Sequence, residues 1–295
     1  MKNSMRLNRL AIVLLVVPGV FWAIQDEQAE TAPSPVMIAA VSRDISALRG
    51  GIGYGKRTKA GEVEVEPIAF LAASGEWEAL PCTPGTGAGC RKFARQYLSK
   101  RHTFSVVSAD GKGAIVTANP VVLSECYGYN GTGTYSGGHI SKSAIAAASS
   151  MDLFDTPPPL TLANLSEASQ IRQALRPLAP QRLDSVEDLR LFHLQLENSD
   201  LLIVQRAYMD NIDPKNFTRK LIFGIGHVEK GRFVVLHWKQ NTSDEQEEVL
   251  GTIRMKNGRD FLITTVSDPE SQSFRIYGIH NGKLKLVFSG GGSSC

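Results

Sequence analysis

Short runs that alternate apolar with polar residues, or that concentrate β-branched ones, recur along most of the chain. Such runs are typical of strands. The Asn-Gly pairs at residues 257–258 and 281–282 lie between two pairs of runs, and because both residue types tolerate positive φ they predict tight hairpins. The runs occupy residues 63–71, 103–107, 114–118, 189–195, 201–205, 220–228, 233–238, 250–255, 261–266, 274–279 and 284–288.

Helical signals are few. Residues 91–99 place Phe93 and Tyr97 four apart on one face of a short helix, and Ser166 is expected to cap another helix that stops before Pro177. The balance of signals predicts a mainly β protein of antiparallel meanders. We expect a propeller-like or sandwich domain in the C-terminal half, preceded by a smaller β-rich domain with one or two short helices.

The N-terminus has the pattern of an export signal. Lys2, Arg6 and Arg9 precede an unbroken apolar run over residues 10–24, and acidic residues follow it at once. The run is shorter than the ~20 apolar residues of a membrane-spanning helix. We therefore expect residues 1–24 to be an export signal, either removed by signal peptidase or retained as an N-terminal anchor, and the protein to be periplasmic or extracellular.

Net charge argues against a nucleic-acid partner. The chain carries 32 basic and 29 acidic residues, so without Lys2, Arg6 and Arg9 the balance is 29 to 29. Neutralising phosphates requires a basic surface. The segment after the signal has no such excess, and we expect no nucleic-acid binding.

Two breaks divide the chain beyond the signal. Residues 25–35 read as a tether, and the prolines of residues 155–159 (DTPPP) cannot continue a helix or a central strand. This predicts a β-rich domain over residues 36–155, a proline-rich connection with a short helix over 156–182, and a meander domain over 183–295.

Four cysteines follow the signal, which in an oxidising compartment suggests disulfides. Cys82 and Cys90 flank a glycine-rich loop and are the favoured pair, which leaves Cys126 with Cys295. The sequence leaves the other two pairings open, and buried unpaired thiols are the alternative. Because no closely spaced C-x-x-C pair is present, a zinc site is not indicated. We expect neither a metal site nor a cofactor.

The C-terminal half contains two similar blocks about 60 residues apart. Residues 194–204 and 253–266 each have the pattern of a strand, a polar turn that contains Asn and then Asp, and a second, apolar strand. Each block is followed by a hairpin that has a glycine at its turn, Gly231 in the first case and Gly282 in the second. The alternative is that any two β-meanders look alike. A true repeat would stack similar sheets against one another.

Over residues 183–292 this block order, with the ending FRIY…GKLKLVFSGGG, resembles degenerate FG-GAP or VCBS-type repeats. The resemblance implies β-propeller blades in an exported protein. That family's turns carry an aspartate-rich calcium loop, whereas the turns here retain only Asp200 and Asp260, and Lys256 and Arg259 would repel a cation. Calcium needs six to eight oxygen ligands, so the resemblance supports the fold and not calcium binding.

The segment 127–139 (YGYNGTGTYSGGH) combines glycines with tyrosines. As a loop it could present aromatic faces to a sugar or peptide, which makes Tyr127, Tyr129, Tyr135 and His139 the candidate ligand-binding residues. The alternative is an ordinary glycine-rich connection. A nucleophile elbow is not indicated, because a G-x-S-x-G pattern is missing around residue 136.

Three further patterns are weaker. Residues 50–56 fit G-x-x-x-x-G-K, but Arg57 replaces the Ser or Thr that a phosphate loop requires. His227 and His237 share a hairpin, yet a ~13 Å separation would prevent them from sharing a metal ion. The acidic run 244–248 reads as a solvated surface.

Taken together, these patterns predict an exported, non-catalytic β protein that binds a protein partner or an envelope glycan. The alternative is an exported hydrolase whose acid and base residues are assembled from distant loops, which would require a pocket that brings them within hydrogen-bond reach of one substrate position.

Overall fold

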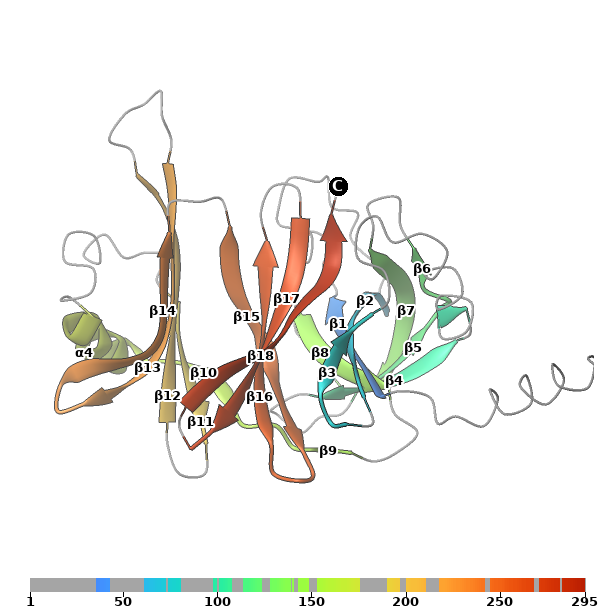
Figure 1. The fold of residues 1–295 in the computed structure, drawn as a ribbon, viewed down its shortest axis with the longest axis horizontal. Helices are drawn as coiled ribbons and strands as arrows, with labels where there is room; N and C mark the ends of the chain where they lie inside the picture. The colour runs from blue at the N-terminus through green and yellow to red at the C-terminus, as the bar shows by residue number, and fades with distance from the viewer. Residues whose placement is uncertain are drawn as a thin grey trace, which may run out of the picture. The chain divides into compact units, whose positions relative to one another are not determined.

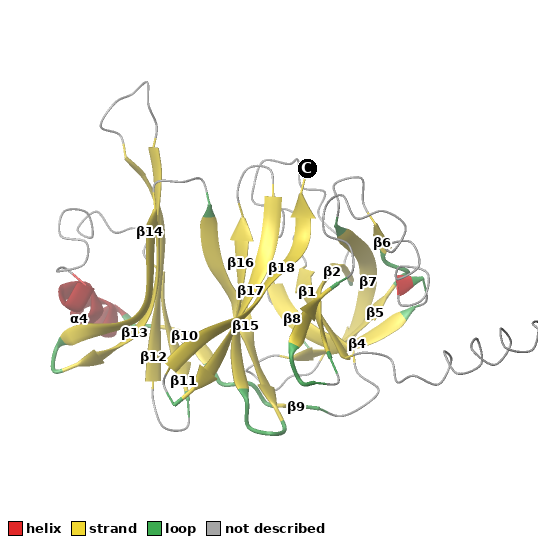
Figure 2. Ribbon diagram, viewed as in Figure 1, coloured by secondary structure: helices red, strands yellow, loops and turns green. Residues whose placement is uncertain are grey.

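The computed structural model confirms a mainly β, antiparallel fold with one helix among the residues it describes (Figures 1 and 2). The chain divides into two units, Met1–Ser34 and Pro35–Cys295, of which the first lies outside the described residues. The structure describes residues 36–42, 61–72, 74–80, 98–99, 101–107, 114–123, 128–138, 140, 143–148, 153–175, 190–196, 200–210, 218–241, 245–267, 271–281 and 283–294.

An eight-stranded antiparallel sheet forms the first part of the larger unit. Its order is β3-β2-β1-β8-β4-β5-β7-β6, and a further pairing of β2 with β7 closes six of these strands into a ring. The strands are β1 (Val36–Ser42), β2 (Glu62–Leu71), β3 (Trp77–Ala79), β4 (His102–Val107), β5 (Ala114–Ala118), β6 (Val122–Leu123), β7 (Tyr129–Gly137) and β8 (Ser143–Ala148).

Strand β1 is buried on both faces. Because successive side chains of a strand point to opposite sides, Met37, Ala39 and Val41 enter the core inside the closed sheet, whereas Ile38 and Ala40 pack outward into a second core. Its sequence, VMIAAVS, is accordingly apolar almost throughout. Strand β1 thus contributes side chains to two hydrophobic cores, one on each of its faces.

Two five-stranded sheets follow, with orders β10-β11-β12-β13-β14 and β18-β17-β16-β15-β9. Each is a four-stranded meander with one extra strand beside its first strand. The elements are β9 (Phe154–Asp155), β10 (Leu160–Leu162), β11 (Arg190–Gln195), β12 (Asp200–Asp210), β13 (Thr218–Glu229), β14 (Arg232–Asn241), β15 (Gln246–Met255), β16 (Asp260–Ser267), β17 (Ser271–His280) and β18 (Lys283–Ser294).

The two meander sheets stack face to face through an apolar layer. Leu201, Ile203 and Phe223 of the first sheet share a core with Leu262 and Tyr277 of the second. The opposite face of the second sheet packs on the outer face of β1 and β2. The opposite face of the first sheet packs on helix α4 (Leu165–Leu175). The stack is therefore covered at one end by a helix and at the other by the closed sheet.

The proline-rich segment connects the two stacked sheets. Strand β9 pairs with the edge of β15, and β10, five residues later, pairs with the edge of β11. Between them Pro157 and Pro158 are buried, and the Thr252 hydroxyl donates a 2.9 Å hydrogen bond to the Pro158 carbonyl. The break expected at residues 155–159 is thus a crossing within one compact unit.

Helix α4 begins two residues earlier than expected. Asn164, not Ser166, caps it: the Asn164 side chain accepts a hydrogen bond from the Glu167 backbone N–H at 2.9 Å, and the Glu167 carboxylate accepts one from the Asn164 N–H at 3.0 Å. This reciprocal pair is a capping box. Among the described residues, no helix combines the length and apolar character needed to cross a bilayer.

Candidate functional site

The tyrosine- and glycine-rich segment is a strand and not the expected loop. Residues 129–137 form β7, which pairs with β2, β5 and β6, because glycines allow the paired backbones to approach closely. Tyr129 is only 4% exposed in the core of the closed sheet, and Tyr135 packs against the same core. Burial raises the pKa of the Tyr129 hydroxyl. Tyr129 therefore does not present a free ring to a ligand.

Several candidate residues lie outside the described residues. These are Tyr127 and His139 at the ends of the tyrosine segment, the glycine-rich residues 50–56, and the four cysteines Cys82, Cys90, Cys126 and Cys295. The disulfide pairing therefore stays a prediction. Within the described ranges, no group of His, Cys, Asp or Glu side chains is arranged to hold a metal ion.

A cluster of charged side chains lies between the stacked meander sheets, and it includes Glu245 and Glu247 of the run expected on the surface. Residue 245 precedes β15 and Glu247 lies on it, so alternation turns both toward the facing sheet. Glu247 is buried. The expectation of a solvated face at 244–248 is therefore wrong for Glu247. Strand alternation turns its side chain inward, and partners on neighbouring strands compensate its charge there.

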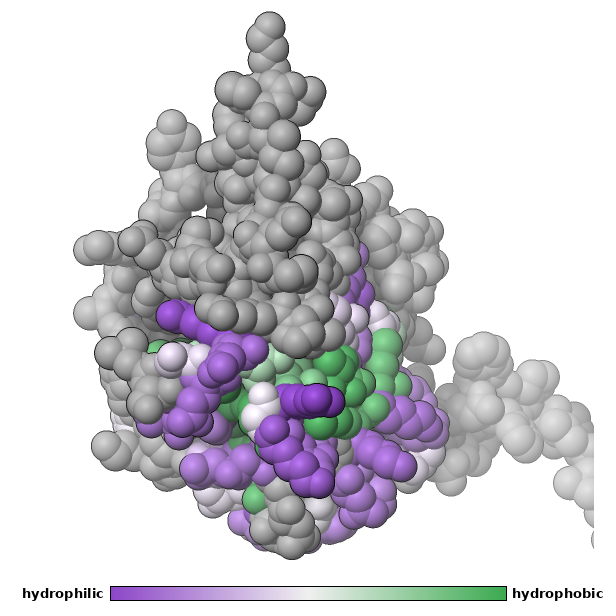
Figure 3. Space-filling model, turned by 90° about the vertical axis from the view of Figure 1, so that its left-hand side faces the viewer, coloured by the Kyte–Doolittle hydropathy of each residue, from purple (hydrophilic) through white to green (hydrophobic). Residues whose placement is uncertain are grey.

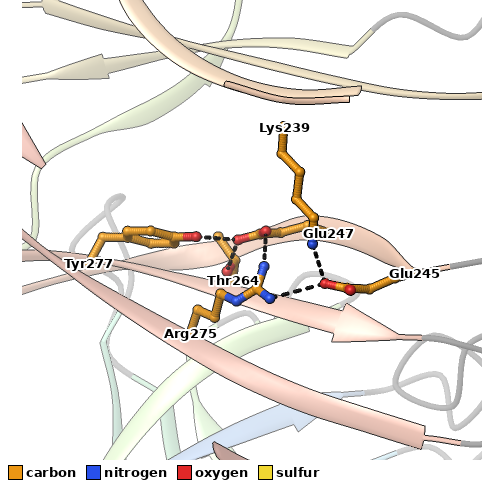
Figure 4. A network of polar contacts seen from close by, with 6 residues as sticks. All are labelled: Lys239, Glu245, Glu247, Thr264, Arg275 and Tyr277. Atoms are coloured by element: carbon orange, nitrogen blue, oxygen red, sulfur yellow. Dashed lines mark hydrogen bonds and ion pairs between the residues drawn. The ribbon is translucent and has the colours of Figure 1, made fainter. Parts of the chain in front are cut away.

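Glu247 is held by three side chains from β16 and β17 (Figure 4). Its Oε1 accepts hydrogen bonds from the Thr264 hydroxyl at 2.9 Å and from the Tyr277 hydroxyl at 2.7 Å. Its Oε2 pairs with the Arg275 guanidinium. Both oxygens of this buried carboxylate are thus engaged by fixed donors.

A second carboxylate extends the network toward the other sheet (Figure 4). Arg275 also donates to Glu245 at 3.0 Å, and Glu245 pairs with Lys239, which comes from β14 of the facing sheet. The cluster therefore links the last strand of one meander to the first three strands of the next.

Burial and charge shift the pKa values of this cluster. Burial is the largest cause of the raised pKa of Tyr277, and the charge of Glu247 and the hydrogen bond to it add to the effect. Burial opposes the lowered pKa of Glu245, but the hydrogen bond and charge of Lys239 and the charge of Arg275 outweigh it. At neutral pH the tyrosine is therefore a hydroxyl donor and Glu245 a carboxylate.

His237 borders the cluster from β14. Its ring centroid lies 5.5 Å from that of Tyr277 and 5.9 Å from that of Phe223, and the latter contact is edge-on. The Nε2 atom is buried and has no hydrogen-bond partner. Burial is the main cause of the lowered pKa of His237, and Arg275 and Lys239 lower it further while Glu247 opposes them.

A polar contact nearby also crosses between the sheets. Gln205 on β12 is buried, and its side-chain oxygen accepts a 3.1 Å hydrogen bond from the Val249 backbone N–H of β15. The register of β15 against β16 shifts just after Val249. At a β-bulge the ladder is disrupted locally, so the glutamine satisfies a donor there.

This assembly is a structural ion-pair network, in which the pair of Lys239 with Glu245 connects the two sheets. A general base needs an oxygen or nitrogen that can reach a substrate proton, whereas each Glu247 oxygen already accepts from a protein donor. Sequence reasoning missed the assembly because its members come from four separate strands. The available signal was side chains able to hydrogen-bond spaced two apart, at 245 and 247 and at 275 and 277.

An exposed apolar area lies on the outer face of the β13–β14 hairpin. Val228 pairs with Phe233 and Gly226 with Val235, so these side chains share the face that packs on α4. Val228 is 40% and Val235 38% exposed. Figure 3, seen from the side of α4 and this hairpin, shows an apolar area bordered by hydrophilic residues.

No family model, curated protein or solved structure matches this chain.

Proposed function

We propose that this chain is an exported, non-catalytic β protein that binds an envelope glycan or a protein partner. The observation that carries the proposal is the closed bonding of the Glu247 cluster, in which the acids and bases brought together from distant segments bond to one another. The basic and apolar pattern of residues 1–24 supports export. The two meanders, with the same strand order, are interpreted as degenerate copies of a propeller-blade repeat.

The contact surface in this proposal is the outer face of the β13–β14 hairpin. Val228 and Val235 expose apolar surface there, and Glu229, Lys230 and Arg232 at the turn are exposed beside them. An apolar centre with a polar rim is the usual composition of a binding surface. Among the described strands β14 is also the edge of its sheet, and an edge strand is a place where another chain can pair.

Export is tested with the full chain and a variant that lacks residues 2–24, both with a C-terminal tag. We expect the full chain in the exported fraction and the truncated one in the cytoplasm. Intact mass measured without reductant then reports both the N-terminus after export and the number of free thiols. Equal cytoplasmic retention of both chains would contradict the export proposal.

Binding is tested by co-sedimentation with purified cell-wall glycan and, separately, by cross-linking in intact cells. The double variant Val228→Glu, Val235→Glu is compared with Leu286→Glu, which alters a side chain that is 48% exposed on β18 of the other sheet. We expect the double variant to lose binding and the control to keep it. Equal binding by both, or turnover of the glycan by the purified protein, would contradict the proposal.

A further inference from the structure

His237 occupies an unusual position in the layer between the sheets. Its imidazole lies against two aromatic rings, Tyr277 of the facing sheet and Phe223 of its own, and its buried Nε2 atom has no hydrogen-bond partner. A neutral imidazole tolerates such surroundings, because one of its two ring nitrogens carries no hydrogen and so requires no acceptor. An imidazolium does not, because both of its N–H groups require acceptors.

The charges that face His237 balance only while it is neutral. Glu245 and Glu247 contribute two negative charges, and Lys239 and Arg275 contribute two positive ones. Tyr277, from β17, stays protonated and is already committed as a donor to Glu247, while Thr264 of β16 and Gln205 of β12 are neutral. A proton on His237 would therefore give the cluster a net positive charge, which Lys239 and Arg275 disfavour and Glu247 favours.

We propose that His237 is an acid-sensitive latch, and that its protonation releases the packing of β13 and β14 on β15–β17. This proposal does not depend on the binding surface proposed above. Mild acid would raise the population of the state in which the β13–β14 hairpin has separated from the second sheet.

The direction of the pH dependence follows from burial. The pKa of His237 is lowered from 6.5 in the packed state, mainly by burial. At pH values between this lowered pKa and 6.5, His237 therefore binds a proton in the released state but not in the packed state. The contribution of His237 to packing is complete above pH 6.5 and is lost as the pH falls through and below this value.

Hydrogen exchange tests the latch region by region in the full-length protein. Amide protection factors are measured at pH 7.5 and pH 5.5 in β13–β17, with β4 and β5 of the closed sheet as the internal reference. His237→Phe keeps a ring against Tyr277 and Phe223 but cannot titrate, and His280→Phe, at an exposed site on β17, is the matched control. His237→Gln provides the same comparison if the phenylalanine does not fit.

We expect wild type and His280→Phe to lose up to about tenfold in protection of β13–β17 between the two pH values, because the released state takes up the proton one unit below its pKa. His237→Phe should lose much less, and β4 and β5 should be unchanged in all three proteins. The latch is refuted if the His237 variants respond to acid as wild type does. Equal loss of protection in the closed sheet would also refute it, because the acid effect would then be global.

Discussion

Removal of one hydroxyl from the buried cluster should measurably weaken the protein. Tyr277→Phe keeps the aromatic ring but deletes the donor that lies 2.7 Å from Oε1 of Glu247. Hydrogen bonds to charged groups contribute about 1.5–3 kcal/mol each. Because Thr264 and Arg275 still hold the carboxylate, we expect a loss of about 2 kcal/mol in the free energy of unfolding, which for a protein of this size lowers Tm by roughly 3–4 °C.

The assay is urea unfolding at pH 7 together with calorimetry, with Tyr135→Phe on the closed sheet as the control. A second measurement follows the same stabilities at alkaline pH. Since the pKa of Tyr277 is raised from 10.0 in the folded state, the unfolded chain loses this proton first, and stability falls as the pH rises above 10. This fall should be smaller in Tyr277→Phe. A loss below about 0.5 kcal/mol at pH 7 would be no larger than that of an ordinary surface substitution and would show that this hydroxyl contributes little to stability.

Three further substitutions test local features by urea unfolding. Asn164→Ala removes the cap of α4 and should cost about 1 kcal/mol; an unchanged midpoint would show that the cap is dispensable. Gly226→Ala would place its Cβ 2.2 Å from the Val234 carbonyl oxygen, against 3.3 Å to the nearest atom for Gly278→Ala, so the former should cost about 1–3 kcal/mol or more and the latter clearly less; the opposite ranking would contradict the described packing. Ile38→Ala empties a fully buried position and should cost about 2–5 kcal/mol; a loss below about 1 kcal/mol would argue against the second core.

The C-terminal strands could be predicted from the sequence because their signal is local. The runs at 261–266 and 274–279 lie within β16 and β17, and Asn257 and Asn281 lie at the expected hairpin turns. Asn281 adopts a φ of 51°, the left-handed conformation that asparagine tolerates. Alternation and turn chemistry were sufficient for these elements.

Strands β7 and β8 were missed because their residue types carry little strand signal, and β1 was missed because its short apolar run, VMIAAVS, does not alternate. β7 (YNGTGTYSG) is rich in glycine and β8 (SAIAAA) in alanine, and both types are depleted in strands in general. Their conformation depends on partners far along the chain, such as Val65 of β2 opposite Gly131. Closure of the sheet, and not local propensity, determines these strands.

The inter-sheet cluster could not be predicted for a related reason. Glu247 and Tyr277 are 30 residues apart and become neighbours only through strand order. The acidic run around Glu247 indicated a surface position because its compensating arginine lies on another strand. The burial of Tyr129 likewise follows from the closed sheet, whose interior the sequence pattern does not specify.

The most direct test of the account is a double-mutant cycle on Glu247 and Arg275, read as the free energy of unfolding. The two side chains lie on β15 and β17 of the same sheet and form the central ion pair of the cluster. Arg275→Met should cost about 3 kcal/mol, because it leaves the buried Glu247 charge without a cation, and Glu247→Leu should cost less, because Arg275 keeps Glu245. The double variant should cost less than the sum of the two single losses, because no buried charge is then left without a counter-charge, although Thr264 and Tyr277 still lose their acceptor. A double variant whose loss equals the sum of the two single losses would contradict the account.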